Sequence, residues 1–126
     1  MTISSPKRRT AGHRDLDVWQ VGMELVVAAY SATKTFPSDE RFGLTAQIRR
    51  AVVSIPANLA EGHARRGSGE FRHFVSIARG SLAELDTELE AAERLGFVPA
   101  LSLAETRRLM TSVGRMLTAL AKALRE

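Results

Sequence analysis

Apolar residues in two long segments of the chain recur at alternating steps of three and four residues. In the first segment the recurring residues are Phe71, Val75, Ala78, Leu82, Leu85, Leu89 and Ala92. In the second segment they are Leu103, Thr106, Met110, Val113, Leu117, Leu120 and Leu124. A repeat that averages about 3.5 residues keeps one stripe of a helix against its neighbours in knobs-into-holes packing. The sequence therefore predicts two long bundle helices in the second half of the chain.

Two further helices are predicted in the first half. The first has an expected capping box, in which Asp17 caps the helix and Gln20 is the third helical residue, and it ends near Phe36. Ser38 and the two acids after it are expected to begin the second helix, because acidic side chains in a first turn complement the helix dipole. Pro56 falls inside this second helix, where the missing backbone hydrogen bond predicts a kink.

Glycines mark the remaining helix boundaries. The turn at 67–69 precedes the third helix, which Ser68 is expected to cap, and Gly96 gives that helix a glycine C-cap. Ser102 and Glu105 are expected to form the capping box of the fourth helix. Short connections make successive helices antiparallel, so the predicted fold is an all-α, up-down-up-down antiparallel four-helix bundle over residues 15–126. Residues 1–14 are polar and basic without an apolar period, and we expect them to form a flexible basic tail.

Composition and motifs narrow the function classes. The 126 residues have the size of one domain and include no cysteine, which excludes disulfides and thiolate metal sites. No membrane span or signal peptide is visible, so we expect a cytoplasmic protein without membrane contact. Glu70 and His73 have the Glu-x-x-His spacing of di-iron bundles, but no second copy exists, and no nucleophile stands beside a suitable base. We therefore expect no enzyme activity, no metal and no cofactor.

Charged residues occur in blocks along the chain, and most of the basic ones are arginines. The chain has fifteen Arg against three Lys and a net charge of +4. The planar guanidinium matches phosphate in two parallel hydrogen bonds, so this bias favours an anionic partner. The alternative is a solvated surface whose arginines pair with the acids of residues 84–93. The candidate nucleic-acid-binding residues are Arg49, Arg50, Arg65, Arg66, Arg72, Arg79, Arg108, Arg115 and Lys122.

The predicted second helix has two unusual stripes beside its core face. One stripe is polar, and together with polar residues of the third helix we expect it to form a hydrogen-bonded network that fixes helix register. The network residues are Gln47, Ser54, Asn58, Glu61, Ser81 and Glu84. The other stripe is small and apolar on the far side of the helix, and it consists of Val53, Pro56, Ala57 and Ala60. A single chain would leave this second apolar face in contact with water, so the face predicts an oligomer interface.

A series of short motifs carries a family resemblance. These motifs are DLDVW at 15–19, FP at 36–37, GLT at 43–45, QIRRA at 47–51, SIPANLAEG at 54–62 and ARGS at 78–81. With them the chain resembles, over residues 15–97, the bacterial four-helix-bundle proteins also called 23S rRNA intervening-sequence proteins. The resemblance implies a four-helix bundle and a ring-shaped homopentamer, with genes sometimes found inside insertions of large-subunit ribosomal RNA. It implies no known reaction and assigns no catalytic residue.

A related group extends what the resemblance implies. The accessory variability determinants of diversity-generating retroelements share this fold and pentamer, and they bind nucleic acid and a reverse transcriptase. The leading hypothesis is a non-enzymatic homo-oligomer that binds nucleic acid through arginine-lined surfaces, with RNA favoured over DNA. The alternative is an oligomeric scaffold that holds a protein partner and binds no nucleic acid.

Overall fold

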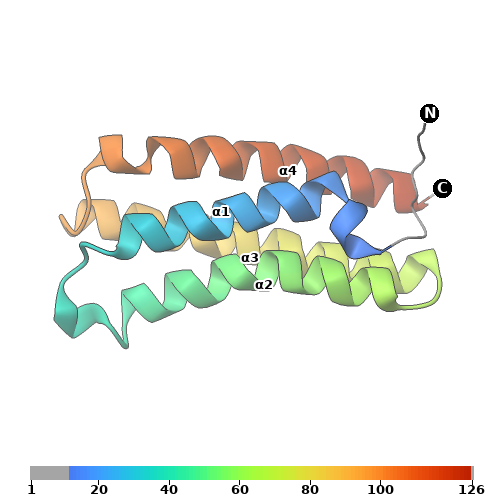
Figure 1. Cartoon of the computed structure of the whole chain (residues 1–126), viewed down its shortest axis with the longest axis horizontal. Coiled ribbons are helices and arrows are strands. Elements are labelled where there is room, and N and C mark those ends of the chain that lie inside the picture. Colours follow the sequence, from blue (N-terminus) through green and yellow to red (C-terminus); the bar gives the residue numbers. More distant parts are fainter. Residues whose placement is uncertain (1–11, 126) are drawn as a thin grey trace.

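Four long helices make up almost all of the structure. The computed structural model describes residues 12–125, and its helices are α1 (Asp17–Thr33), α2 (Leu44–Ala64), α3 (Ser68–Arg94) and α4 (Ala104–Arg125). Three short 3₁₀ turns, at His13–Asp15, Ser38–Glu40 and Ala100–Leu103, precede α1, α2 and α4. Successive helices lie alongside one another and are joined at alternate ends of the molecule (Figure 1). The predicted all-α, up-down-up-down four-helix bundle is therefore confirmed.

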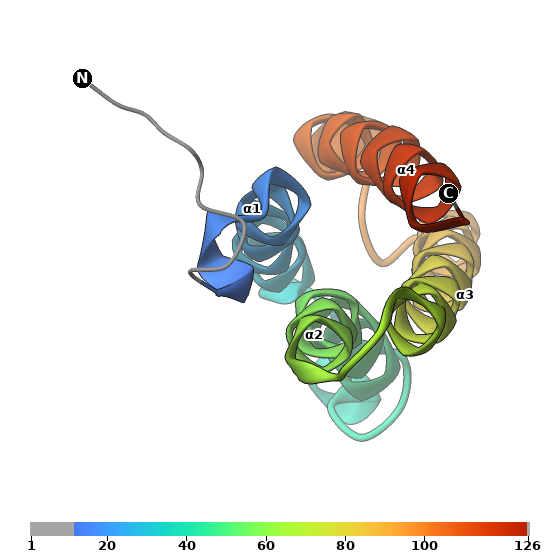
Figure 2. The ribbon, with the colours of Figure 1, turned by 90° about the vertical axis from the view of Figure 1, so that its right-hand side faces the viewer.

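The core runs along the axis that the four helices surround (Figure 2). Every helix contributes fully buried side chains to it, for example Leu25 of α1, Ile55 of α2, Leu85 of α3 and Val113 of α4. The repeating residues of α3 and α4 are all buried or half-buried, as their spacing predicts. Within residues 12–125, none of the helices combines the length and the apolar character needed to cross a bilayer.

The start of α1 differs from the predicted capping box. Leu16 occupies the N-cap position, no side chain caps the helix, and the Gln20 amide donates a hydrogen bond to the Arg14 carbonyl at 2.9 Å. The preceding 3₁₀ turn replaces the cap, since His13 and Arg14 both pack on the Trp19 ring. These two residues therefore belong to the fold, whereas the rest of the predicted tail, up to residue 11, lies outside the described residues.

The starts of the later helices also differ from the predicted caps. Helix α2 begins at Leu44, and its backbone N–H donates to the Glu40 carboxylate at 2.9 Å. Gly67, with a φ of 87°, is the N-cap of α3, so Ser68 is already helical. Helix α4 begins at Ala104 after a 3₁₀ turn, so the capping box predicted there is wrong.

The end of α3 is the glycine stop that the sequence predicts. Gly96 has a φ of 83°, a conformation that side chains with a Cβ rarely adopt. Its N–H donates to the Glu93 carbonyl at 3.0 Å, and the Phe97 N–H donates to the Ala92 carbonyl at 2.9 Å. These two bonds satisfy the last carbonyls of the helix and form a Schellman motif.

The most extensive helix contact in the bundle joins α2 to α3. A Cβ placed on Gly62 would lie 2.7 Å from the Phe74 Cβ and 3.0 Å from the Phe71 Cδ1, so only glycine permits this approach. On the opposite side of α2, Pro56 lies within ordinary contact distance of a Cβ built at Gly22 of α1. Pro56 is buried in the single chain. Its predicted place on the outward face of α2 is therefore wrong, because it packs against α1.

Alanine at Gly62 is expected to destabilise the bundle, because α2 and α3 must separate to admit the new methyl group. Overpacking of this kind costs about 1–3 kcal/mol of unfolding free energy. Gly80 is the matched control, since it lies mid-helix in α3 and a methyl group added there would have nothing within 4 Å. Gly80→Ala should instead stabilise the protein by about 0.5–1 kcal/mol. Chemical denaturation of both variants measures the two effects, and equal stability would contradict the close α2–α3 approach.

Candidate nucleic-acid interface

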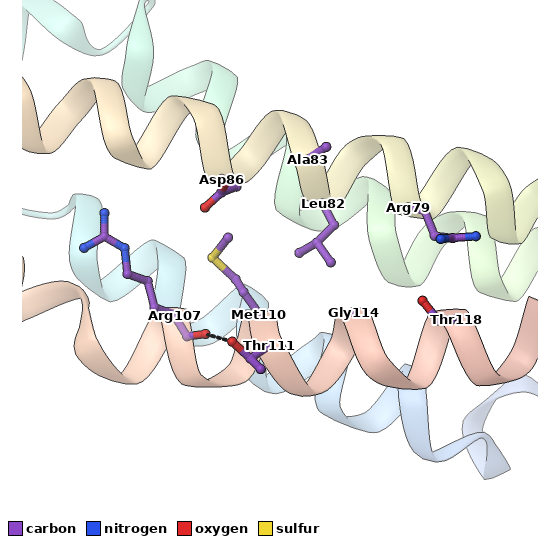
Figure 3. Close-up of a pocket in the computed structure, with 9 residues that line it drawn as sticks. All are labelled: Arg79, Leu82, Ala83, Asp86, Arg107, Met110, Thr111, Gly114 and Thr118. Carbon is purple, nitrogen blue, oxygen red and sulfur yellow. Dashed lines mark hydrogen bonds between the residues drawn. The ribbon is translucent and has the colours of Figure 1, made fainter.

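A hollow of about 530 Å³ follows the seam between α3 and α4 (Figure 3). Leu82 of α3 and Met110 of α4 lie between the two helices and form its apolar part. Gly114 permits the close approach here, since a Cβ at this position would already touch Leu82 at 3.4 Å. Arg79 lies at one end of the hollow and Arg107 at the other (Figure 3). The seam is therefore apolar at its base and charged at both ends.

A second hollow of about 390 Å³ continues the seam toward the start of α3 and the end of α4. Its lining is Gly69, Arg72, His73, Ser76, Arg79, Ala121 and Arg125. Arg79 lines both hollows, so it stands where the two adjoin. Among residues 12–125 no acid lines this second hollow, which we call the basic hollow. Its positive charge is therefore not neutralised by its own walls.

The guanidinium of Arg72 is held in place within the basic hollow. Its Nη1 donates to the Leu124 carbonyl at 3.2 Å, and the side chain is half-buried. One bond of this kind leaves most of the five N–H donors of an arginine available. Arg79 is exposed, and within residues 12–125 it forms no ion pair. Of the predicted nucleic-acid contacts, these two are the ones that the structure brings together.

Arginines at the other end of the seam are neutralised by acids. Arg107 pairs with Glu93 at 2.8 Å and with Glu90 at 3.5 Å, and Arg94 also pairs with Glu90. The predicted contact Arg108 pairs with Glu105 at 2.6 Å. That hydrogen bond lowers the pKa of the Glu105 carboxyl and raises the pKa of the guanidinium. The alternative interpretation, arginines paired with the acids of residues 84–93, holds for Arg94 and Arg107, whereas Arg108 pairs with an acid outside that segment.

Two predicted contacts on α2 serve structural roles. Arg49 donates to the Thr33 hydroxyl at 2.9 Å, and its guanidinium lies 4.4 Å from the centre of the Tyr30 ring, so it fastens α2 to α1. Arg65 pairs with Glu61 at 2.8 Å and lies over the Phe74 ring. Both guanidiniums are therefore engaged within the chain.

The remaining predicted contacts are exposed but scattered. Arg50 and Arg66 lie on the exposed side of α2 and of the turn after it. Arg115 and Lys122 are exposed on α4 but line neither hollow of the seam. Arg108, seven residues before Arg115 on α4, feels the charge of Glu24 on α1, which places this face of α4 toward α1. The basic residues of this face therefore do not form one surface with Arg72 and Arg79 of α3.

The three polar residues His73, Ser76 and Arg125 line the basic hollow but are absent from the contacts that the sequence predicts. In the sequence, the spacing of His73 from Glu70 indicates at most a metal ligand. No motif in the sequence distinguishes Ser76 and Arg125 from other polar surface residues. The sequence does contain one signal for Arg125. Ala121 and Arg125 continue the steps of three and four residues on which Gly114 and Thr118 lie, and all four residues line the α3–α4 seam. Within residues 12–125, no three His, Asp or Glu side chains gather as a metal site would require.

The predicted polar network forms in part between α2 and α3. The hydroxyls of Ser54 and Ser81 hydrogen-bond to each other across the two helices, and the Asn58 amide donates to the Ser54 carbonyl at 2.8 Å. Gln47 is exposed, and Glu61 pairs with Arg65 instead of joining this group. The network therefore fixes the α2–α3 register with fewer members than the helix periodicity predicts.

A buried carboxyl lies about two turns beyond Ser81 on α3. Glu88 is 7% exposed, and within the described residues its Oε1 has no hydrogen-bond partner. Burial raises the pKa of Glu88 to about 7, and the neighbouring Glu84 carboxylate contributes to this rise, whereas Arg50 of α2 opposes it. Glu84, a predicted network member, is thus a neighbour of Glu88 on the exposed side of α3.

Glutamine at position 88 is expected to stabilise the protein at high pH. The folded chain holds the Glu88 proton up to about pH 7, whereas the ordinary pKa is 4.5, so wild-type stability falls as pH rises between these values. Above pH 7 the variant should gain about 1–3 kcal/mol, because its neutral amide avoids the cost of holding an ionised carboxylate in a buried position. Thermal unfolding of Glu88→Gln at pH 5 and pH 8 measures this gain. Asp86→Asn, which removes an exposed charge nearby, should show no such pH dependence.

The predicted oligomer face of α2 is partly open. Val53 is 41% exposed, Ala57 is exposed and Ala60 is half-buried, whereas Pro56 is buried as described above. A hollow of about 500 Å³ adjoins Val53 and is lined also by Tyr30, Ala46, Arg49, Arg50 and Ser54. An apolar strip beside a hollow of this size is a surface onto which another chain could pack.

Fold and site together define a class of protein: an all-helical up-down bundle with a basic hollow along one helix seam. The chain matches the family model described as 23S rRNA-intervening sequence protein over residues 14–119. This match covers most of the chain, so the chain belongs to that family. A comparison with curated proteins found no match.

Proposed function

We propose that this protein is a non-enzymatic, cytoplasmic homo-oligomer that binds nucleic acid, with RNA favoured over DNA. The observation that carries the proposal is the basic hollow, where Arg72, Arg79 and Arg125 surround a space whose lining, within the described part of the chain, includes no acidic residue. Guanidiniums present paired N–H donors that fit phosphate oxygens. Where few acidic side chains lie nearby, their positive charge is not neutralised and attracts an anion. The family description names the 23S rRNA intervening sequence, which supports RNA as the partner.

Phosphate contact, rather than base reading, is the mechanism that this surface supports. Arg115 and Lys122 lie exposed on the same helix as Arg125 and add to the positive field. Each phosphate that an arginine neutralises releases a counterion, which makes affinity fall steeply with salt. Trp19 is half-buried against His13 and Arg14 and does not offer a free face for base stacking. Sequence-independent binding is therefore expected.

Loss of two arginines from the basic hollow should weaken RNA binding. Arg79→Gln combined with Arg125→Gln is expected to lower affinity roughly tenfold or more and to reduce the salt dependence by about two counterions. The control is Arg94→Gln, an exposed arginine of α3 at the other end of the bundle that pairs with Glu90. Filter-binding titrations against RNA and DNA at several salt concentrations measure both quantities. Equal affinity of the double variant and the control would exclude the basic hollow as the contact.

The oligomer is proposed to be a ring of five subunits, the state that the family resemblance implies. Its contact surface includes the exposed apolar strip of Val53 and Ala57 on α2. Small apolar side chains allow helices of neighbouring subunits to approach closely, and burying them from water stabilises the assembly.

A charge on this strip should separate the subunits. Ala57→Glu is expected to shift the molar mass in light scattering from that of an oligomer to that of a single chain, because the buried carboxylate would lack a partner. Ala119→Glu is the matched control, since Ala119 is an exposed alanine of α4. It should leave the assembly unchanged. A single-chain mass for the unmodified protein would contradict the interface directly.

A protein-binding scaffold is the second candidate function, and one observation favours it. Phe42 and Leu101 are each 87% exposed and Leu95 is 62% exposed. The α1–α2 and α3–α4 connections that carry them lie at the same end of the bundle, opposite the start of α3 (Figure 1). Exposed large apolar residues of this kind mark protein contacts. Failure of both RNA and DNA to bind at low salt would favour this candidate.

A further inference from the structure

The basic hollow lies where the first turns of α3 meet the last turn of α4. We propose that it holds a terminal phosphomonoester of a nucleic-acid strand in preference to the phosphodiesters within the strand. This inference rests on the proposed function and names the part of the nucleic acid that the hollow takes.

The charge of the hollow fits a phosphate that carries two negative charges. Three guanidiniums line it, and none of the lining residues that the structure describes is acidic. A phosphomonoester carries a charge of about −1.5 to −2 at pH 7 and offers three acceptor oxygens. A phosphodiester carries a single charge and offers two free oxygens. The additional charge and oxygen give the terminal group one more charge-assisted hydrogen bond among the arginines.

One arginine of the hollow is held in place before any ligand binds. Arg72 is half-buried, and its bond to the Leu124 carbonyl sets the position of the guanidinium. Ser76 adds a hydroxyl and His73 an imidazole to the same wall. A group that is already ordered loses little conformational entropy on binding, which favours a compact ligand in a fixed place.

Among the described residues, the positive charge that no acid neutralises covers only a short part of the seam, which favours the end of a nucleic-acid strand as the ligand. Arg72 and Arg79 are seven residues apart on α3, which is about 10 Å along the helix. Beyond Arg79 the seam meets Asp86, and then Arg107 with its partner acids Glu90 and Glu93. A strand whose backbone continued along the seam would bring its phosphates toward these carboxylates. Only the first phosphate lies where none of the described lining residues is acidic.

The size of the hollow agrees with this occupant. Its volume of about 390 Å³ is near the lower end of the range of roughly 300–1,000 Å³ that is common for small-molecule sites. Such a space holds a phosphate group and the sugar attached to it, but it does not hold a duplex.

Helix termini alone do not explain the arginine positions. Basic residues near the end of α4 complement the helix dipole, which accounts for Arg125 and for the Arg72 contact with Leu124. Arg79 lies two turns further along α3, away from that terminus, and forms no ion pair within residues 12–125. Its position on both hollows is what a ligand at their junction would require.

The test compares single-stranded RNAs of one sequence, about 12 nucleotides long, that differ only at their ends. One carries a 5′-phosphate, one a 3′-phosphate and one hydroxyls at both ends, each with a fluorophore at an unmodified position. Anisotropy titrations with the full-length protein should show about tenfold tighter binding of a phosphorylated end, the value of one charge-assisted hydrogen bond. Arg125→Gln and Arg79→Gln should each bring this ratio close to one. Arg115→Gln, an exposed arginine of α4 outside the hollow, should keep it.

The outcomes separate this inference from the proposed function. Equal binding of all three RNAs would overturn the terminal-phosphate inference and leave RNA binding intact. A preference that survives in both Arg125→Gln and Arg79→Gln would overturn the basic hollow as its location. Absence of binding by any of the RNAs would overturn both proposals. Displacement of the phosphorylated RNA by inorganic phosphate, beyond that by chloride at equal ionic strength, would support the inference.

Discussion

The close packing of α2 on α3 is the contact on which the rest of the structure depends. At Gly62 the two helices approach so closely that a methyl group would collide with Phe74, and further along the same contact the hydroxyls of Ser54 and Ser81 bond to each other. Together these contacts fix both the register and the rotation of α3. Because α3 is held in that rotation, Arg72 and Arg79 face the seam with α4. The basic hollow therefore depends on the packing of the other face of α3 against α2.

Periodicity predicts the helices well but their starts poorly, and the reason is physical. Steps of three and four residues record burial along a whole helix, so the stripes of α3 and α4 are buried as expected. The stop at Gly96 is also predictable, since a positive φ at a helix end favours glycine. Helix starts instead depend on turns that form only when the chain folds back. Glu40 reaches Leu44 from a 3₁₀ turn, and the first turn of α1 rests on residues 13–15, so the nearest polar residue does not mark the boundary.

The site is harder to predict, because arginines that look alike in the sequence have different roles in the fold. Sequence spacing identifies which arginines share a helix face, but not which acids lie opposite them in the fold. Arg49 reaches Thr33 and Tyr30 of α1, and Arg65 pairs with Glu61 and lies over the Phe74 ring, so both guanidiniums already have partners within the chain. Arg125 can be placed beside Arg72 only once the end of α4 is known to meet the start of α3. Tertiary pairing therefore decides which positive charges remain.

The distribution of those remaining charges follows from the antiparallel arrangement of α3 and α4. Acids are concentrated in the second half of α3, and the antiparallel partner brings Arg107 opposite them, where Glu90 and Glu93 neutralise it. The first half of α3 is rich in arginine and meets the last turn of α4, which is also basic. Opposite charges thus meet at one end of the seam and like charges at the other. Like charges held together in a folded chain raise its free energy, and an anion bound between them would lower it. The basic end of the bundle is therefore the part of this surface where a phosphate would stabilise the fold as well as bind to it.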